Sequence, residues 1–284
     1  KATYELIERI INSREIEEYN PFQDFISQHL TDSSGEGHIV ALFASVECDD
    51  TEYLLHFGRK WLVSVIASIH GEHSPLMLVL SGEEHGTGKT EFFRRLLPRE
   101  LHGKFYAESK LDRDKDDEIL MTQRLIIMDD EMGGKSKKES KKLKDLTSKQ
   151  VFTLREPYGR NNVDLQRLAV LCGTTNDSEI LSDQTGNRRI IPVHVKSIDH
   201  AAYNRVDKTA LFMESYHLFM TGFPWRLDKH DIAYLNKDAS KFEVTDVEKG
   251  KKVICEAGTE LILRMGKATV IANQKGGLAN VTTG

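Results

Sequence analysis

The chain has 284 residues, of which 39% are hydrophobic and 29% are charged, and its formal net charge is −5. This balance is typical of a soluble globular protein with a buried core, and the acidic net charge argues against a protein that simply coats DNA. No apolar run approaches the roughly 18–20 residues of a membrane span, no leader opens the chain, and three distant cysteines form no C-x-x-C pair. We therefore expect a cytoplasmic protein and, because the chain begins at Lys1, a piece of a longer one.

Residues 1–72 are predicted to form an N-terminal helical segment. Apolar side chains recur at helical spacing in residues 7–11 and 22–26, and they form a broad stripe along Tyr53–His70. A polar, glycine-containing break at 32–37 separates two of these helices. The simplest interpretation is a helical cap that packs on the next domain.

Residues 73–223 change to short apolar runs that alternate with helices. Three of these runs are continuously apolar: Leu76–Leu80, Leu125–Met128 and Leu168–Cys172. Such runs are typical of parallel strands that are covered on both faces. Ile190–Val195 is a fourth candidate strand, and Pro192 within it indicates a sheet edge. The alternation predicts an α/β fold with a parallel sheet and crossover helices.

The first predicted strand leads into a glycine-containing loop and then Gly-Lys-Thr, followed by an amphipathic helix that ends at Pro98. Backbone N–H groups of such a loop converge on phosphates, and the start of the helix adds a positive dipole. Lys89 would supply charge to the β- and γ-phosphates of ATP, and the Thr90 hydroxyl would coordinate Mg²⁺. The predicted nucleotide-binding residues are Gly82, Gly86, Thr87, Gly88, Lys89 and Thr90.

This loop departs from the usual G-x-x-x-x-G-K-[ST] spacing, because Glu83 occupies the position of the first glycine and Gly82 precedes it. Either the loop is one residue longer, or Gly86 and Gly88 provide its tight curvature. In both cases Glu83 and Glu84 are expected to point away from the phosphates, since like charges repel. The alternative interpretation is an ordinary glycine-rich turn between a strand and a helix.

The second predicted strand ends in three acids, Asp129, Asp130 and Glu131. Ligands of open α/β sheets lie at the carboxyl ends of strands, where one acid can hold Mg²⁺ and the next can polarise the attacking water. We assign the metal to Asp130 and the water to Glu131, while the other register, Asp129 and Asp130, stays open. Thr90, Asp129 and Asp130 are thus the candidate metal ligands, and a solvated turn is the alternative.

Two further polar groups are candidates for catalysis. The third predicted strand ends in Asn176, whose amide can position water near the γ-phosphate; a helix cap is the alternative. Arg188 and Arg189 precede the fourth strand. Either of them can neutralise charge in the transition state, often from a neighbouring subunit, although a surface salt-bridge pair would have the same sequence.

Five segments in this order resemble the virulence-associated E family, whose ATPase is akin to superfamily 3 and poxvirus-type primase-helicases. The segments are G-T-G-K-T-E-F-F-R-R-L-L-P (86–98), D-D-E (129–131), R-E-P-Y-G-R (155–160), Q-R-L-A-V-L-C-G-T-T-N (166–176) and T-G-N-R-R (185–189). The resemblance covers roughly residues 38–225. The later segments are much more specific than a phosphate loop alone.

The resemblance implies an AAA+-like, additional-strand P-loop sheet, in which the strand ending at Asn176 lies between the strands of Lys89 and Asp130. It also implies a homo-oligomeric ring, expected to be a hexamer, that hydrolyses Mg²⁺-ATP and translocates on DNA. The chain would then be a DNA helicase, or the helicase portion of a primase-helicase, from a phage or mobile element. By the same resemblance Asn176 is the sensor, and Arg188 or Arg189 is the arginine finger.

A basic run at 135–144, with Lys149, follows the acids and precedes two candidate strands, Val151–Arg155 and Val163–Leu168. In superfamily 3 relatives a hairpin before the sensor strand lines the ring pore. By resemblance Arg155, Tyr158 and Arg160 are candidate contacts to single-stranded DNA, and Lys149 adds charge. The alternative for the basic run is a solvated helix face.

The segment 224–284 is polar and mixed, and Gly258–Met265 and Ala268–Val281 are predicted as two short helices, a truncated winged-helix unit. Two other functions stay open beside the motor. One is an NTP-dependent switch or interference protein that binds DNA, a primase or another replication partner without unwinding. The other is a small-molecule kinase, which has no need for G-T-T-N followed by T-G-N-R-R.

Overall fold

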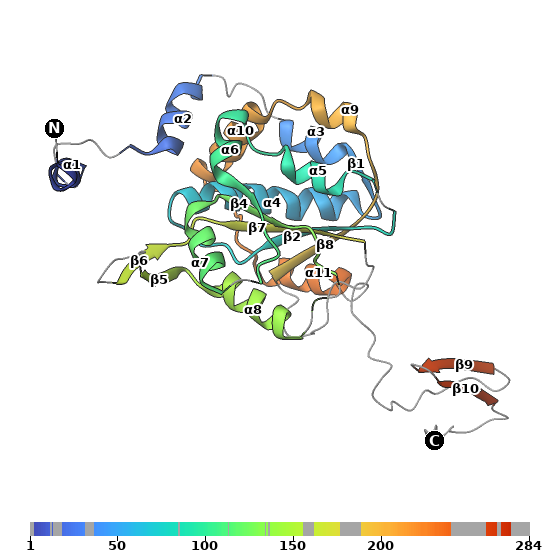
Figure 1. Cartoon of the computed structure of the whole chain (residues 1–284). Helices are drawn as coiled ribbons and strands as arrows, with labels where there is room; N and C mark the ends of the chain where they lie inside the picture. The colour runs from blue at the N-terminus through green and yellow to red at the C-terminus, as the bar shows by residue number, and fades with distance from the viewer. Residues whose placement is uncertain are drawn as a thin grey trace. The chain divides into compact units, whose positions relative to one another are not determined.

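The computed structural model describes residues 3–11, 13, 19–31, 37–84, 86–112, 114–133, 135, 137–155, 162–176, 189–239, 260–265 and 268–273. Contacts between residues divide the chain into two compact units, Lys1–Glu243 and Val244–Gly284. In the larger unit helices cover both faces of a central sheet (Figure 1). None of the helices in the described residues is both long enough and apolar enough to cross a membrane.

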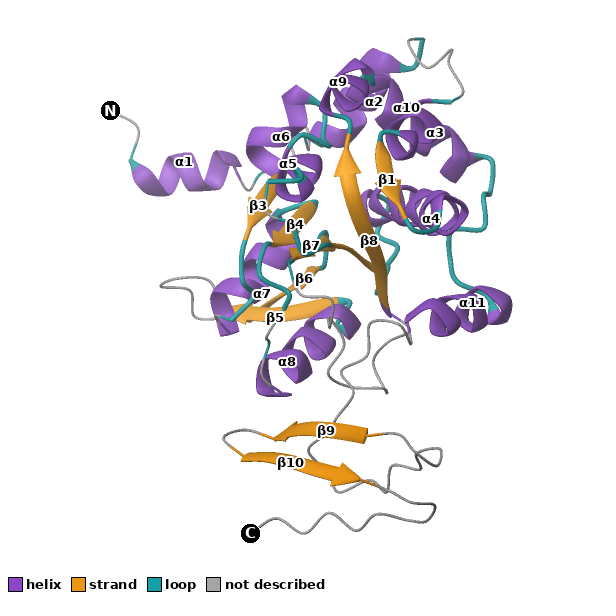
Figure 2. Ribbon diagram, turned by 90° about the vertical axis from the view of Figure 1, so that its right-hand side faces the viewer, coloured by secondary structure: helices purple, strands orange, loops and turns teal. Residues whose placement is uncertain are grey.

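Among the described residues, six strands form the central sheet, in the order β1-β8-β2-β7-β4-β3; β1, β8, β7, β4 and β3 are labelled in Figure 2. They are β1 (Val46–Cys48), β2 (Met77–Ser81), β3 (Tyr106–Glu108), β4 (Ile126–Asp129), β7 (Val170–Thr175) and β8 (Ile190–Ile198). β8, β2, β7, β4 and β3 run parallel, whereas β1 pairs antiparallel with β8. The four strands predicted from apolar runs are therefore confirmed, and β7 lies between β2 and β4 as the family resemblance implies.

Pro192 was predicted to mark a strand at the edge of the sheet. Only the first half of β8, which contains Pro192, lies at an edge. β8 pairs with β2 from Ile190 to His194, and on its other side β1 covers only Val195–Ile198. Proline donates no backbone hydrogen bond, so it is tolerated where one flank of a strand has no partner. β8 as a whole is nevertheless an interior strand, because the short β1, which the sequence analysis missed, covers its second half.

The described helices of this unit are α1 (Tyr4–Ile11), α2 (Pro21–His29), α3 (His38–Ala44), α4 (Thr51–Ile69), α5 (Lys89–Arg94), α6 (Arg99–Phe105), α7 (Asp114–Gln123), α8 (Lys137–Ser148), α9 (His200–Arg205), α10 (Lys208–Met220) and α11 (Lys229–Ala239). Asp50 caps α4 by accepting a hydrogen bond from Tyr53 N at 2.8 Å. Glu214 of α10 accepts from Gly37 N and Ile39 N, at 3.1 and 3.0 Å, and so ties the start of α3 to α10.

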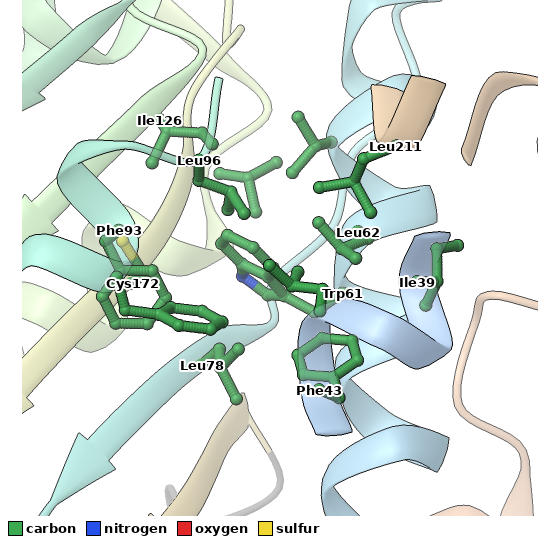
Figure 3. Packing of buried hydrophobic residues seen from close by; sticks show 14 of the residues in the cluster. Ile39, Phe43, Trp61, Leu62, Leu78, Phe93, Leu96, Ile126, Cys172 and Leu211 are labelled. Atoms are coloured by element: carbon green, nitrogen blue, oxygen red, sulfur yellow. The ribbon is translucent and has the colours of Figure 1, made fainter. Parts of the chain in front are cut away.

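Alternate residues of the central strands face two different cores, as the pleat of a strand requires. Leu78 and Leu80 of β2 pack in one core with residues of α4, α5 and α10, whereas Met77 and Val79 pack in the other with residues of α7 and α8. Figure 3 shows Trp61 of α4 in the centre of the first core. Its indole Nε1 donates a buried hydrogen bond of 2.9 Å to the carbonyl of Leu171 in β7, which fixes α4 to the sheet.

The domain boundaries predicted at 72/73 and 223/224 are not where contacts divide the chain. Residues of α3 and α4 share one core with the sheet, and the compact unit extends to Glu243. The helical character of the first seventy residues is otherwise confirmed in the described part, apart from β1. α2, α3 and α4 are thus part of the α/β unit, because their buried apolar residues belong to the same core as the strands, whereas the apolar residues Tyr4, Leu6, Ile7 and Ile10 of α1 are exposed.

The predicted hairpin is present as β5 (Val151–Arg155) and β6 (Asn162–Gln166), which pair antiparallel from Val151↔Gln166 to Arg155↔Asn162. Phe152 and Leu154 point into the second core, while alternate residues of β5 are exposed. The tip at 156–161 lies outside the described residues. The hairpin therefore has one buried and one solvent-facing side along β5.

The prediction of two helices near the C-terminus was wrong. Glu260–Met265 (β9) and Ala268–Asn273 (β10) form an antiparallel two-stranded sheet. Thr269, Val270 and Ile271 are consecutive β-branched residues, which lose side-chain freedom in a helix and favour a strand. The apolar spacing of so short a segment fits both periods, so this local preference decides the structure.

Candidate functional site

A cleft of about 350 Å³ opens at the carboxyl edge of the parallel strands. It is lined by Gly86, Thr87, Gly88, Lys89, Thr90, Glu91, Asp130, Thr174, Thr175, Asn176 and His200. These residues come from the loop after β2, the end of β4, the end of β7 and the start of α9. Three segments selected separately from the sequence thus meet at one site, together with His200, which the sequence analysis did not select.

The curvature of the loop after β2 rests on two glycines. Gly86 and Gly88 have φ angles of 78° and 88°, in the left-handed region that favours glycine. These angles agree with the alternative in which Gly86 and Gly88 provide the tight curvature, and whether the loop also contains one extra residue stays open. Glu83 and Glu84 are exposed and do not line the cleft, which is consistent with side chains that point away from bound phosphates.

Lys89 is held inside this loop. Only 6% of the residue is exposed, and its ammonium group donates to the carbonyls of Gly82 and Glu84, at 2.9 and 3.0 Å, and to Thr87 Oγ1 at 3.2 Å. Burial lowers its pKa from the usual 10.5, against the charge of Glu84. Because these three acceptors are neutral, the positive charge of Lys89 at the cleft stays uncompensated by them, as an anion-binding site requires.

The three acids at the end of β4 lie in different environments. Asp129 is fully buried, with Oδ2 2.6 Å from Lys135 Nζ; burial raises the pKa of this carboxyl, against the opposite effect of the Lys135 charge. Glu131 is exposed and forms an ion pair with Lys110. Asp130 is exposed and lines the cleft. Asp130 is thus the acid of this group that lines the same cleft as Lys89, whereas the catalytic roles of all three stay predictions.

The end of β7 is joined to the loop that carries these acids. The backbone N–H of Met132 donates to the carbonyl of Thr174 at 3.0 Å, and Thr174 Oγ1 donates to the carbonyl of Asp130 at 3.3 Å. Asn176 follows directly, is exposed and lines the cleft. The amide predicted as a sensor and the predicted metal-binding acid are therefore held next to each other by the backbone.

The predicted arginine finger is only partly described. Arg188 lies outside the described residues, whereas Arg189 is half-buried at the start of β8 and does not line the cleft. Parallel β2 and β8 are adjacent and in register from Met77↔Ile190. Arg189 therefore lies near the amino end of β8, at the sheet edge opposite the cleft.

The donors at the cleft fit a magnesium ion that arrives with a triphosphate. Thr90 and Asp130 offer a hydroxyl and a carboxylate, and Mg²⁺ typically binds through one or two such groups together with phosphate oxygens and water. No group of three or more His, Cys, Asp or Glu in the described residues forms a metal cage on its own. Asp129 is less suited to bind the ion directly, because its carboxylate already contacts Lys135.

The two predicted DNA-binding residues that the structure describes, Lys149 and Arg155, do not line the cleft. Lys149, at the end of α8, is 2.6 Å from Glu118 of α7, and its Nζ lies 5.7 Å from the ring centroid of Phe152. Arg155 is exposed at the end of β5, whereas Tyr158 and Arg160 lie outside the described residues. The role of these residues in DNA binding stays a prediction.

His200 was missed because its position follows from the sheet and not from a motif. It is the first residue of α9, two residues after the end of β8. A Cβ atom placed on Gly88 would lie only 2.1 Å from His200 Cε1, so the imidazole lies directly over the loop. The one available signal was its place after a predicted strand, where ligands of α/β sheets bind.

The fold and the cleft define an α/β protein with a largely parallel sheet and a polar site at its carboxyl edge. The sequence matches the model of the Virulence-associated protein E-like domain over residues 29–244, which is more than half of the chain. The chain therefore belongs to this family. No curated protein matches it.

Solved structures of the C-terminal region of NrS-1 (residues 305–718) are similar to this chain. The A form apo structure has 12% sequence identity and a TM-score of 0.46, and the match covers 81% of this chain and 52% of that one. Another apo structure of the same region has 13% identity and a TM-score of 0.44, with 80% and 51% covered. This chain thus spans about half the length of these structures.

Proposed function

We propose that this protein is a Mg²⁺-dependent ATPase and the motor of a DNA helicase, or of the helicase portion of a primase-helicase, from a phage or mobile element. The observation that carries the proposal is the shared cleft of Lys89, Asp130 and Asn176, which come from three separate segments. Membership of the Virulence-associated protein E-like family supports it.

Each residue in the cleft has a role that follows from its chemistry. Lys89 neutralises the β- and γ-phosphates, and Thr90 and Asp130 hold the magnesium ion. Asn176 orients the attacking water beside them. Glu131 does not line the cleft and would polarise that water only after its carboxylate leaves Lys110. This exchange costs little because an ion pair between exposed side chains contributes little to stability.

The motor step needs DNA and neighbouring subunits. We propose that the β5–β6 hairpin contacts single-stranded DNA within a homo-oligomeric ring, a hexamer by family resemblance, through Arg155, Tyr158 and Arg160. Arg188 or Arg189 would complete the site of an adjacent subunit, which fits the position of Arg189 outside the cleft of its own chain. Such a ring would act together with a primase or another replication partner.

A specific observation favours a second candidate, a nucleotide-dependent switch that binds DNA or a partner without unwinding. Two lysines of the basic run are paired with acids of α7, since Lys142 lies 3.0 Å from Asp117 and Lys149 lies 2.6 Å from Glu118. These pairs reduce the charge that α8 offers to a DNA phosphate backbone, and phosphate contacts supply most of the non-specific affinity for DNA.

The ATPase rate with and without single-stranded DNA separates these functions. The wild type should hydrolyse ATP faster with DNA, and Lys89→Ala should lose nearly all turnover, because the transferred phosphoryl group loses its direct cation. Lys229→Ala, an exposed lysine at the start of α11, is the matched control and should keep wild-type turnover. Unchanged turnover in Lys89→Ala would refute the assigned site, and ATP binding without DNA-stimulated turnover would support the switch.

A further inference from the structure

Among the described residues that line the cleft, His200 is the one that follows β8, on the far side of the phosphate loop. β8 lies beside β2 on the side opposite to β7, and His200 follows β8 directly. A Cβ on Gly88 would lie 2.1 Å from Cε1 and 2.6 Å from Nε2 of its ring. The imidazole therefore lies against the backbone of the loop just before Lys89, and His200 also lines the cleft.

The helix that carries His200 is fixed to its surroundings on two sides. Asp199 caps α9 by accepting from Ala202 N at 2.9 Å, and its own backbone N–H donates to the carbonyl of Ser45 at 2.8 Å. On the other side the buried Tyr203 hydroxyl donates to the carbonyl of Phe92 in α5 at 2.6 Å. Because α5 begins at Lys89, these bonds fix the backbone of α9, from which the His200 side chain extends, relative to the phosphate loop.

The order of strands gives the cleft two ends. Asp130 and Asn176 follow β4 and β7, on one side of the loop, and His200 follows β8, on the other. If the γ-phosphate lies beside the acid and the amide, as hydrolysis requires, the rest of the molecule extends across the loop toward α9. The nucleoside then reaches the imidazole, which has no hydrogen-bond partner among the residues that the structure describes.

We propose that His200 binds the nucleoside portion of the nucleotide through a hydrogen bond of its imidazole, and so distinguishes a nucleoside triphosphate from a bare polyphosphate. This inference rests on the proposed function of the cleft. An imidazole offers both a donor and an acceptor nitrogen, which suits ribose hydroxyls or polar atoms of a base. Lys89 and the loop would bind the phosphates in either ligand, whereas His200 would contribute only when a nucleoside is attached.

Equilibrium binding of Mg²⁺-ATP, Mg²⁺-ADP and Mg²⁺-tripolyphosphate to the whole chain tests the proposal. We expect His200→Ala to weaken ATP and ADP roughly tenfold, the usual effect of one hydrogen bond, and to leave tripolyphosphate unchanged. His200→Asn keeps a donor and an acceptor and should recover most of the affinity, whereas His200→Phe keeps only the flat ring and should not. His230→Ala, an exposed histidine of α11, is the matched control.

Two results would overturn the inference while the proposed function stands. One is wild-type affinity of His200→Ala for ATP; the other is an equal loss for ATP and tripolyphosphate, which would mean that the histidine acts on the phosphates or on the shape of the loop. Recovery by His200→Phe alone would also overturn it, because a ring without polar atoms cannot form the bond. A wild-type protein that binds neither ligand would instead overturn the proposed function itself, and with it this inference.

Discussion

Arg167 joins the hairpin, α8 and β7, and its removal is expected to destabilise the protein strongly. The side chain is buried, with 6% of the residue exposed. Its guanidinium donates to the carbonyls of Ala169 at 2.6 Å, Thr147 at 2.9 Å and Leu146 at 3.1 Å. The last two belong to the final turn of α8, whose carbonyls have no partner within the helix. Burial lowers the pKa of Arg167 to about 9, so the group is still charged at neutral pH.

Arg167→Met keeps much of the apolar stem and removes the donors from all three carbonyls. Hydrogen bonds to a charged group contribute roughly 1.5–3 kcal/mol each, and relief of the buried charge offsets part of their loss. We therefore expect the free energy of unfolding to fall by about 3 kcal/mol, measured by urea denaturation at pH 7. The matched control is Arg226→Met: Arg226 is 69% exposed and 2.7 Å from Glu72, and its loss should cost less than about 1 kcal/mol.

Equal stability of Arg167→Met and the wild type would refute this reasoning, because the cost of burying the charge would then cancel all three hydrogen bonds. Arg167→Lys gives a second test. Lysine keeps the charge but lacks the planar fork that reaches carbonyls in different directions. It should therefore recover only a minor part of the lost stability.

Two other predictions follow from the structure. Burial lowers the pKa of His73 to about 4. Between about pH 6.5 and 4, His73 therefore binds a proton in the unfolded chain but not in the folded chain. Stability should fall as the pH drops through this window, and denaturation of His73→Gln at pH 7.5 and 4.5 should show a smaller difference than the wild type. Gly88→Ala should lower the free energy of unfolding by about 1–2 kcal/mol, because Gly88 has a left-handed backbone conformation, and it should weaken ATP binding. In the double variant Gly88→Ala, His200→Ala the contact with the imidazole is removed but the backbone strain stays. Full recovery of stability in the double variant would therefore show that the φ angle of Gly88 is unimportant.

The main strands were predictable because each is a short apolar run buried on both faces. β2, β4 and β7 are completely buried, and such runs differ clearly from the amphipathic stripes of the helices. β1 and β3 have three residues each, too few for any period. β1 and β3 form because they pair with β8 and β4, respectively. This pairing cannot be read from the short segments themselves.

The choice among the three acids depended on the pleat of β4. Ile127 belongs to the core beneath α7 and α8, and Ile126 and Met128 belong to the core of α5. Asp129 continues the alternation on the side of Ile127 and meets Lys135 there. The alternation was visible in the sequence, but the side of the sheet occupied by α5 was not, so the sequence alone could not tell which acid lines the cleft. Which acid binds the metal stays a prediction.

The position of β7 decides which polar groups can act on one ligand. β7 pairs with β2 on one side and with β4 on the other, so Asn176 leaves the sheet between the Lys89 loop and Asp130. If β4 paired directly with β2, the acid would lie against the loop and no amide would come between them. The same strand leads back through Arg167 to β6 of the hairpin. Arg167 therefore lies between the hairpin and β7 along the chain, and the hydrogen bonds of its guanidinium join this junction to the end of α8.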